Sequence, residues 1–179
     1  YGRAVGLNGD SEKALRLFTT LLTDFPKDFE IKLNYAESLL WNKNYIVAEK
    51  YYLKLIKEKK NNVPALLGYS NTLSQLNKYE TALVYVNKAL EINPGNTNAI
   101  LSKKYIRLGL ANDKLNTQEY GIAEIILQEN FEDFENDTET LMNLGTLYLV
   151  SNQLDNAKKT YELIGENPNK RLESLNGLC

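Results

Sequence analysis

Small and apolar residues recur along this chain at a nearly constant interval. Alanines stand at Ala14, Ala48, Ala82, Ala123 and Ala157, so the successive intervals are 34, 34, 41 and 34 residues. The positions three before, four after and seven after each alanine are mostly aromatic or aliphatic. These offsets fall on one face of an α-helix. A period in this range indicates a stack of copies of one supersecondary unit.

Each copy contains a second small position, twelve residues before its alanine. Small residues on two facing helices let the helix axes approach closely, so each copy is predicted to be a helix hairpin with a short polar turn. The small residues are Gly2, Ala36, Ser70, Ala111 and Gly145. We expect helix pairs at about 3–7 and 11–24, 29–41 and 45–59, 63–76 and 79–92, 97–115 and 118–134, and 138–150 and 154–166.

The fourth copy carries seven extra residues before Ala123. Seven residues are close to two helical turns, so they lengthen a helix and nearly keep its face. Counting back from Ala123 places Ala111 at the small position, whereas counting forward from Pro94 would place Lys104 there. We therefore expect the extra turns at the start of the long helix. They are either a tolerated length variant or a protruding end that narrows a groove or docks a partner.

This arrangement of positions resembles the tetratricopeptide repeat (TPR) family. The matching residues are Gly145, Tyr148, Ala157, Tyr161 and Pro168 in one copy, and Tyr79, Ala82, Ala89 and Pro94 in another. The resemblance implies an all-α, right-handed superhelical solenoid of antiparallel helix pairs, with the first helix of each pair lining a concave groove. One array would then span residues 1–179, with repeats at about 1–28 (partial), 29–62, 63–96, 97–137 and 138–171, and a further helix starting at 172–179.

Composition restricts the possible chemistry. The chain has one cysteine, Cys179, and no histidine. The usual zinc sites, Cys–His or Ser–His nucleophile pairs and a histidine pH switch are therefore excluded. We expect no catalytic, metal or cofactor-binding residues, and hence no enzyme. Because the chain begins at Tyr1 inside a predicted helix, we interpret it as part of a longer array, whose compartment (cytoplasmic or bacterial periplasmic) is open.

The formal charge of −2 hides a polarity along the chain. Residues 115–157 contain nine acidic residues and no basic one, whereas residues 1–114 carry 17 basic and 11 acidic residues. The acidic stretch predicts attraction to a basic segment of a partner; the alternative is an ordinary solvated face. Nucleic acid is not an expected partner, because the main lysine cluster lies mostly on a second helix and alternates poorly with aromatic residues. That cluster comprises Lys50, Lys54, Lys57, Lys59 and Lys60.

Partner contacts are expected from first-helix residues that need not pack inside their own pair. These residues mix aliphatic and amide side chains, which suits an extended peptide or another helix. We therefore predict a non-catalytic protein–protein interaction scaffold. Trp41 is either an aromatic anchor for a partner or a cap on the junction between pairs. The candidate groove residues are Glu30, Leu33, Glu37, Trp41, Leu67, Asn71, Gln75, Met142 and Thr146.

A second function is suggested by one short segment. Trp41-Asn42-Lys43-Asn44-Tyr45 is similar to the W-x-[GN]-x-Y turn in TPR arms of bacterial envelope proteins, including outer-membrane polysaccharide-export proteins. The alternative is therefore an arm of an export or assembly protein that contacts glycan as well as protein.

Overall fold

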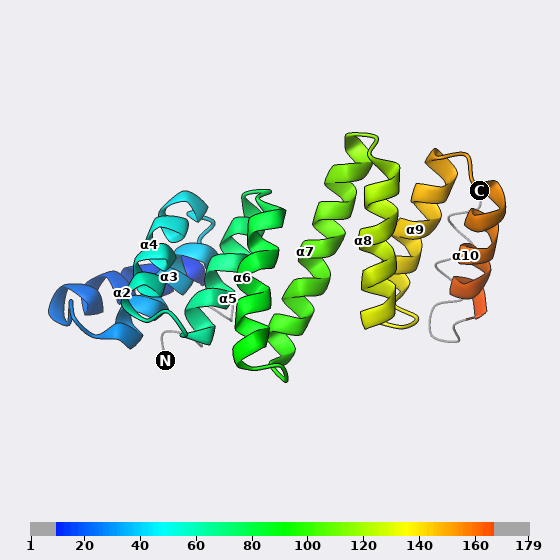
Figure 1. Ribbon diagram of the computed structural model, residues 1–179. Coiled ribbons are helices and arrows are strands. Elements are labelled where there is room, and N and C mark those ends of the chain that lie inside the picture. The colour runs from blue at the N-terminus through cyan, green and yellow to red at the C-terminus, as the bar shows by residue number, and fades with distance from the viewer. Residues whose placement is uncertain (1–9, 167–179) are drawn as a thin grey trace. The chain divides into compact units, whose positions relative to one another are not determined.

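The computed structural model describes residues 10–166, and within that range every regular element is an α-helix (Figure 1). The expected helix at 3–7 and the helix starting near 172 lie outside the described residues. The described helices are α2 (Ser11–Asp24), α3 (Phe29–Trp41), α4 (Tyr45–Glu58), α5 (Val63–Gln75), α6 (Tyr79–Ile92), α7 (Thr97–Asn116), α8 (Tyr120–Asp133), α9 (Thr138–Val150) and α10 (Leu154–Glu166). Each lies within two residues of its predicted bounds.

The alanine period marks the centre of the packing, as predicted. Ala14, Ala48, Ala82 and Ala123 are completely buried, and Ala157 is almost so. The small position of the first helices is also buried, at Ala36, Ser70, Ala111 and Gly145. At Gly145 a Cβ atom would stand 2.6 Å from Cζ of Tyr161, so this ring uses the space that the missing side chain leaves.

The helices form two compact units, with the boundary inside α7. Unit 1 lies within Tyr1–Lys103 and unit 2 within Lys104–Cys179. In unit 1 each helix from α2 to α6 packs against the next, and α3 also contacts α5. In unit 2 α9 packs against α8 and α10. A single apolar cluster includes residues of all four helices, among them Leu108, Leu127, Leu144 and Ala157.

Turn chemistry repeats with the helices. Lys43, Asn77, Gln118 and Asn152 each stand five residues before a repeat alanine, and all four have φ near +60° (57° to 62°). One left-handed residue in a short turn reverses the chain and lets the next helix return antiparallel to the first. The same turn geometry therefore sets the hairpin in each of these four copies.

The seven extra residues are located by the caps of the first helices. An Asp or Asn side chain accepts a backbone N–H three residues on at Asp28, Asn62, Asn96 and Asp137. Helix α7, which follows Asn96, has 20 residues, whereas α3, α5 and α9 have 13 each. Helix α7 is thus seven residues longer than these first helices.

Candidate partner-binding surfaces

The predicted contact residues on α3 and α5 lie at intervals of three or four residues along each helix. Glu37 and Trp41 are half-buried, and so are Leu67 and Asn71. Glu30 at the start of α3 and Gln75 at the end of α5 are exposed. Since α3 contacts α5, the two rows lie on neighbouring first helices of unit 1.

Leu33 differs from its prediction. Its side chain is only 8% exposed, and α3 is covered by α2, α4 and α5. A side chain that is already buried has little apolar surface left to place against a partner. Leu33 is therefore a core residue of unit 1 and not a contact residue.

Both predicted residues on helix α9 are exposed. Met142 is 52% exposed and Thr146 lies one turn further along, also exposed. Val150, another turn on, is 55% exposed. Thr146 and Val150 line an open hollow of about 490 Å³ together with residues of α7, of the α7–α8 turn and of the start of α8. Those residues are Asn112, Leu115, Asn116, Gln118 and Tyr120.

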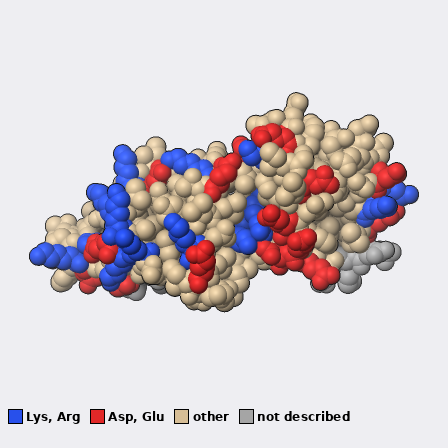
Figure 2. Space-filling view, in the orientation of Figure 1, with Lys and Arg blue, Asp and Glu red and all other residues tan. Residues whose placement is uncertain are grey.

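Acidic side chains gather over unit 2 and basic side chains over unit 1 in the view of Figure 2. The acidic stretch is nevertheless partly neutralised, because α7 supplies its counterions. Lys104 pairs with Asp137 and Glu139, Arg107 with Glu129 and Asp133, and Lys114 with Glu119, at N···O distances of 2.5–3.5 Å. Five of the nine acidic residues of 115–157 are thus in ion pairs. All three basic residues precede position 115, so a count of residues 115–157 misses them.

The Lys104–Asp137 pair is the most buried of these contacts. Nζ of Lys104 donates to Oδ1 of Asp137 at 2.6 Å, and the lysine side chain is only 9% exposed. Burial alone would lower the pKa of Lys104, but the hydrogen bond and charge of Asp137 reverse this and the pKa is raised. The pKa of Asp137 is lowered: burial raises it, but hydrogen bonds from Lys104 and Thr140 outweigh burial. Lys104 is thus a buried residue held in an ion pair. The small residue of this repeat is Ala111, as the count back from Ala123 predicts.

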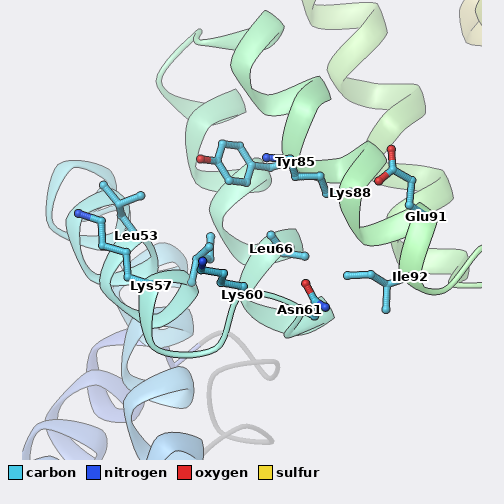
Figure 3. A pocket seen from close by; sticks show the side chains of 10 residues that line it. Leu53, Lys57, Lys60, Asn61, Leu66, Tyr85, Lys88, Glu91 and Ile92 are labelled. Carbon is cyan, nitrogen blue, oxygen red and sulfur yellow. The ribbon is translucent and has the colours of Figure 1, made fainter.

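A second hollow lies in unit 1, between the second helices of two successive pairs. It has a volume of about 520 Å³ and is lined mainly by α4 and α6 (Figure 3). Leu53 and Lys57 approach from α4, Tyr85 and Lys88 from α6, and Leu66 of α5 lies between them. We call this hollow the α4–α6 cleft. The sequence does not predict this cleft. The spacing of its apolar residues is typical of a helix core, and that of its lysines is typical of a solvent-exposed helix face.

Among residues 10–166 no group of histidine, cysteine, aspartate or glutamate side chains is arranged to hold a metal ion. None of the described helices is both long and apolar enough to cross a membrane.

Comparison with known proteins identifies the repeat and the fold. A family model described as tetratricopeptide repeat matches residues 63–96. No curated protein sequence shows significant similarity to the chain. Solved structures do: MamA superposes with a TM-score of 0.71 at 14% identity, covering 97% of both chains.

Two further structures are described as TPR proteins. TTC0263 of Thermus thermophilus has a TM-score of 0.58 at 21% identity, covering 99% of this chain and 95% of its own. YrrB, described as a TPR protein with an unusual peptide-binding site, has a TM-score of 0.67 at 15% identity, covering 98% and 87%. At such identities the likeness establishes an all-α helical repeat solenoid. Residues 63–96 thus match a tetratricopeptide repeat, within a chain that has the fold of a helical repeat solenoid.

Proposed function

We propose that the chain is a non-catalytic scaffold that binds a peptide or helix of a protein partner along its first helices. The row Met142, Thr146 and Val150 carries this proposal. These residues lie at intervals of four on α9, all three are exposed, and two of them line a hollow. Aliphatic, hydroxyl and amide groups together can hold both the side chains and the backbone of a peptide. The peptide-binding site described for YrrB, which shares the fold, supports the same kind of function.

A basic segment in the partner has less support than the sequence alone suggests. Five of the nine acidic residues in 115–157 are already in ion pairs with α7. Glu132, Glu135 and Asp155 are exposed, and a basic segment would meet these. Exposed charges of this kind chiefly change the rate of encounter. We therefore assign the main contribution to the shape and chemistry of the α9 row, and not to charge.

The proposal is tested with Thr146→Arg. A random 12-residue peptide library displayed on phage is selected against the whole chain, and the enriched peptides are synthesised and titrated by fluorescence anisotropy. Arginine at 146 projects a long charged side chain into the hollow, so affinity should fall by about tenfold or more. Thermal stability should change little, because the site is exposed.

Thr19→Arg is the matched control. Thr19 is also an exposed threonine within a helix, and its hydroxyl donates to the carbonyl four residues back, as that of Thr146 does. This variant should bind the peptides as the unchanged chain does. Failure to enrich any peptide, or equal loss of affinity in both variants, would contradict the proposal.

A further inference from the structure

The α4–α6 cleft combines an apolar floor with a basic rim. Leu66 at its base is buried, and Leu53 and Ile56 on α4 are half-buried. Ile92, on the opposite side, is 45% exposed. The volume of about 520 Å³ lies within the usual range of about 300–1,000 Å³ for ligand pockets. The cleft is therefore large enough to take apolar side chains from a binding partner.

The rim carries three lysines and one glutamate: Lys57, Lys60, Lys88 and Glu91. None of these lysines is paired with a carboxylate in the part of the chain that the structure describes. Two other lysines of unit 1 are paired, Lys32 with Glu58 at 2.9 Å and Lys78 with Glu49 at 2.7 Å. A cleft with apolar walls and a net positive rim concentrates a positive potential, which attracts carboxylates.

Helix stability explains only part of this charge. Lys57 lies in the last turn of α4, where a cation interacts favourably with the helix end. Lys60 lies beyond the helix, at the position where Pro26 and Pro94 stand in other copies. Lys88 lies within α6, with Nζ 4.9 Å from the ring centroid of Tyr85. Neither Lys60 nor Lys88 is placed to stabilise the last turn of its own helix.

We propose that the α4–α6 cleft is a second docking site, and that its partner is an acidic peptide segment carrying aliphatic side chains. The aliphatic groups contact Leu53, Ile56 and Ile92, and the Asp or Glu carboxylates contact the three lysines. This site is formed by second helices of unit 1, whereas the proposed partner site on α9 belongs to unit 2. The chain can then hold two partners of different chemistry at once.

The test uses the whole chain and a triple variant, Lys57→Gln, Lys60→Gln, Lys88→Gln. A phage library of random 12-residue peptides is selected on the unchanged chain and counter-selected on the triple variant. Enriched peptides should contain Asp or Glu next to Leu, Ile or Val. Synthesised peptides should lose about tenfold in affinity for the triple variant by fluorescence anisotropy, because three partly exposed ion pairs are removed.

The matched control removes three lysines of unit 1 that do not line the cleft: Lys27→Gln, Lys50→Gln, Lys54→Gln. This control should keep the affinity within about twofold, as charges outside the cleft are screened by solvent. Ile92→Asp, which places a carboxylate in the cleft, should weaken binding as the triple variant does. Thr146→Arg should leave it unchanged, which separates this site from the proposed function.

Three results would overturn the proposal. The first is a set of enriched peptides without an excess of acidic residues, and the second is an equal loss of affinity in both triple variants. The third is binding to vesicles of phosphatidylserine and phosphatidylcholine that is lost in the cleft triple variant, with no binding of acidic peptides. That result would assign the lysines to an anionic membrane surface.

Discussion

At the scale of single residues, close helix approach is set by glycine and alanine. Gly145 on α9 faces the ring of Tyr161 on α10, and the two side chains together fill one space. Gly121 on α8 offers a contrast, because a Cβ atom added there would have no neighbour within 4 Å. The two glycines therefore separate the effect of packing from that of helix propensity.

Gly145→Ala should lower the free energy of unfolding by about 1–3 kcal/mol, because its Cβ would overlap the Tyr161 ring. Gly121→Ala should raise it by up to about 1 kcal/mol, because alanine is the better helix former and nothing opposes its methyl group. Urea denaturation of both variants measures the difference. If Gly145→Ala were as stable as Gly121→Ala, the close approach of α9 and α10 would be refuted.

The repeat alanines could be predicted from sequence because the need for a small residue arises within one hairpin, whose two small positions are only twelve residues apart. The burial of Lys104 could not. Its charge is compensated by Asp137, which is 33 residues away in sequence, and no local spacing links the two. Leu33 was misassigned for a related reason, since a helix with neighbours on three sides buries residues that a single hairpin would expose.

At the scale of elements, α7 supplies basic partners for the acidic side chains of unit 2. Asp137 caps α9 through its hydrogen bonds with Thr140 and at the same time pairs with Lys104 of α7. One carboxylate thus joins the start of one helix to the side of another. The lowered pKa of Asp137 makes this link dependent on pH.

The sign of that dependence follows from the direction of the shift. A carboxyl group whose pKa is lower in the folded state stabilises the fold fully above its ordinary pKa of 3.8. The contribution is lost as the pH falls through the folded-state value. Asp137→Asn retains a cap acceptor but leaves Lys104 buried without this partner. The variant should therefore lose about 1–3 kcal/mol at pH 7, and its difference from the unchanged chain should shrink below pH 3.8.

Asp28→Asn is the control for this prediction. Asp28 caps α3 by accepting from the Ile31 N–H at 3.0 Å, and asparagine caps a helix about as well as aspartate. Denaturation with urea at pH 7 should show a small effect for this variant. Equal losses for both variants at pH 7 would mean that the ion pair with Lys104 contributes nothing.

The helix bounds were predictable, but the α4–α6 cleft was not. The hydrophobic period, the capping residue and the turn residues of each helix all lie close to it in sequence. The residues at which a helix begins and ends therefore depend on its immediate neighbours in the chain. The cleft depends on how far apart two second helices stand, and this follows from the packing of α5 between them. Ile92 and Lys88 have no feature in sequence that distinguishes the wall of a cleft from an ordinary helix surface.

At the scale of the whole molecule, stability is distributed over neighbouring helices. The main contacts within each unit join helices that follow one another, with α3 and α5 as a next-neighbour pair. In such a stack a local defect acts mainly on adjacent repeats. We therefore expect groups of neighbouring helices to unfold separately, and not the whole chain in one cooperative transition.

Ala157→Leu tests this expectation. The alanine is buried in the cluster of unit 2, and overpacking should cost about 1–3 kcal/mol. Amide hydrogen exchange should accelerate in α9 and α10, while the amides of α3 to α6 keep their protection. Uniform acceleration in all of these helices would instead indicate a single cooperative unit.

The packing of consecutive helices within each unit also has a consequence for the speed of folding. Contacts between consecutive helices span few residues, so forming them closes only short loops and sacrifices little chain entropy. Proteins rich in such local contacts fold in microseconds to milliseconds. The two helices of a hairpin such as α5–α6 can pack together as soon as the second helix has been synthesised. The hairpin can then pack against the apolar face of the helices already folded. During synthesis, assembly can therefore keep pace with the emerging chain, one hairpin at a time.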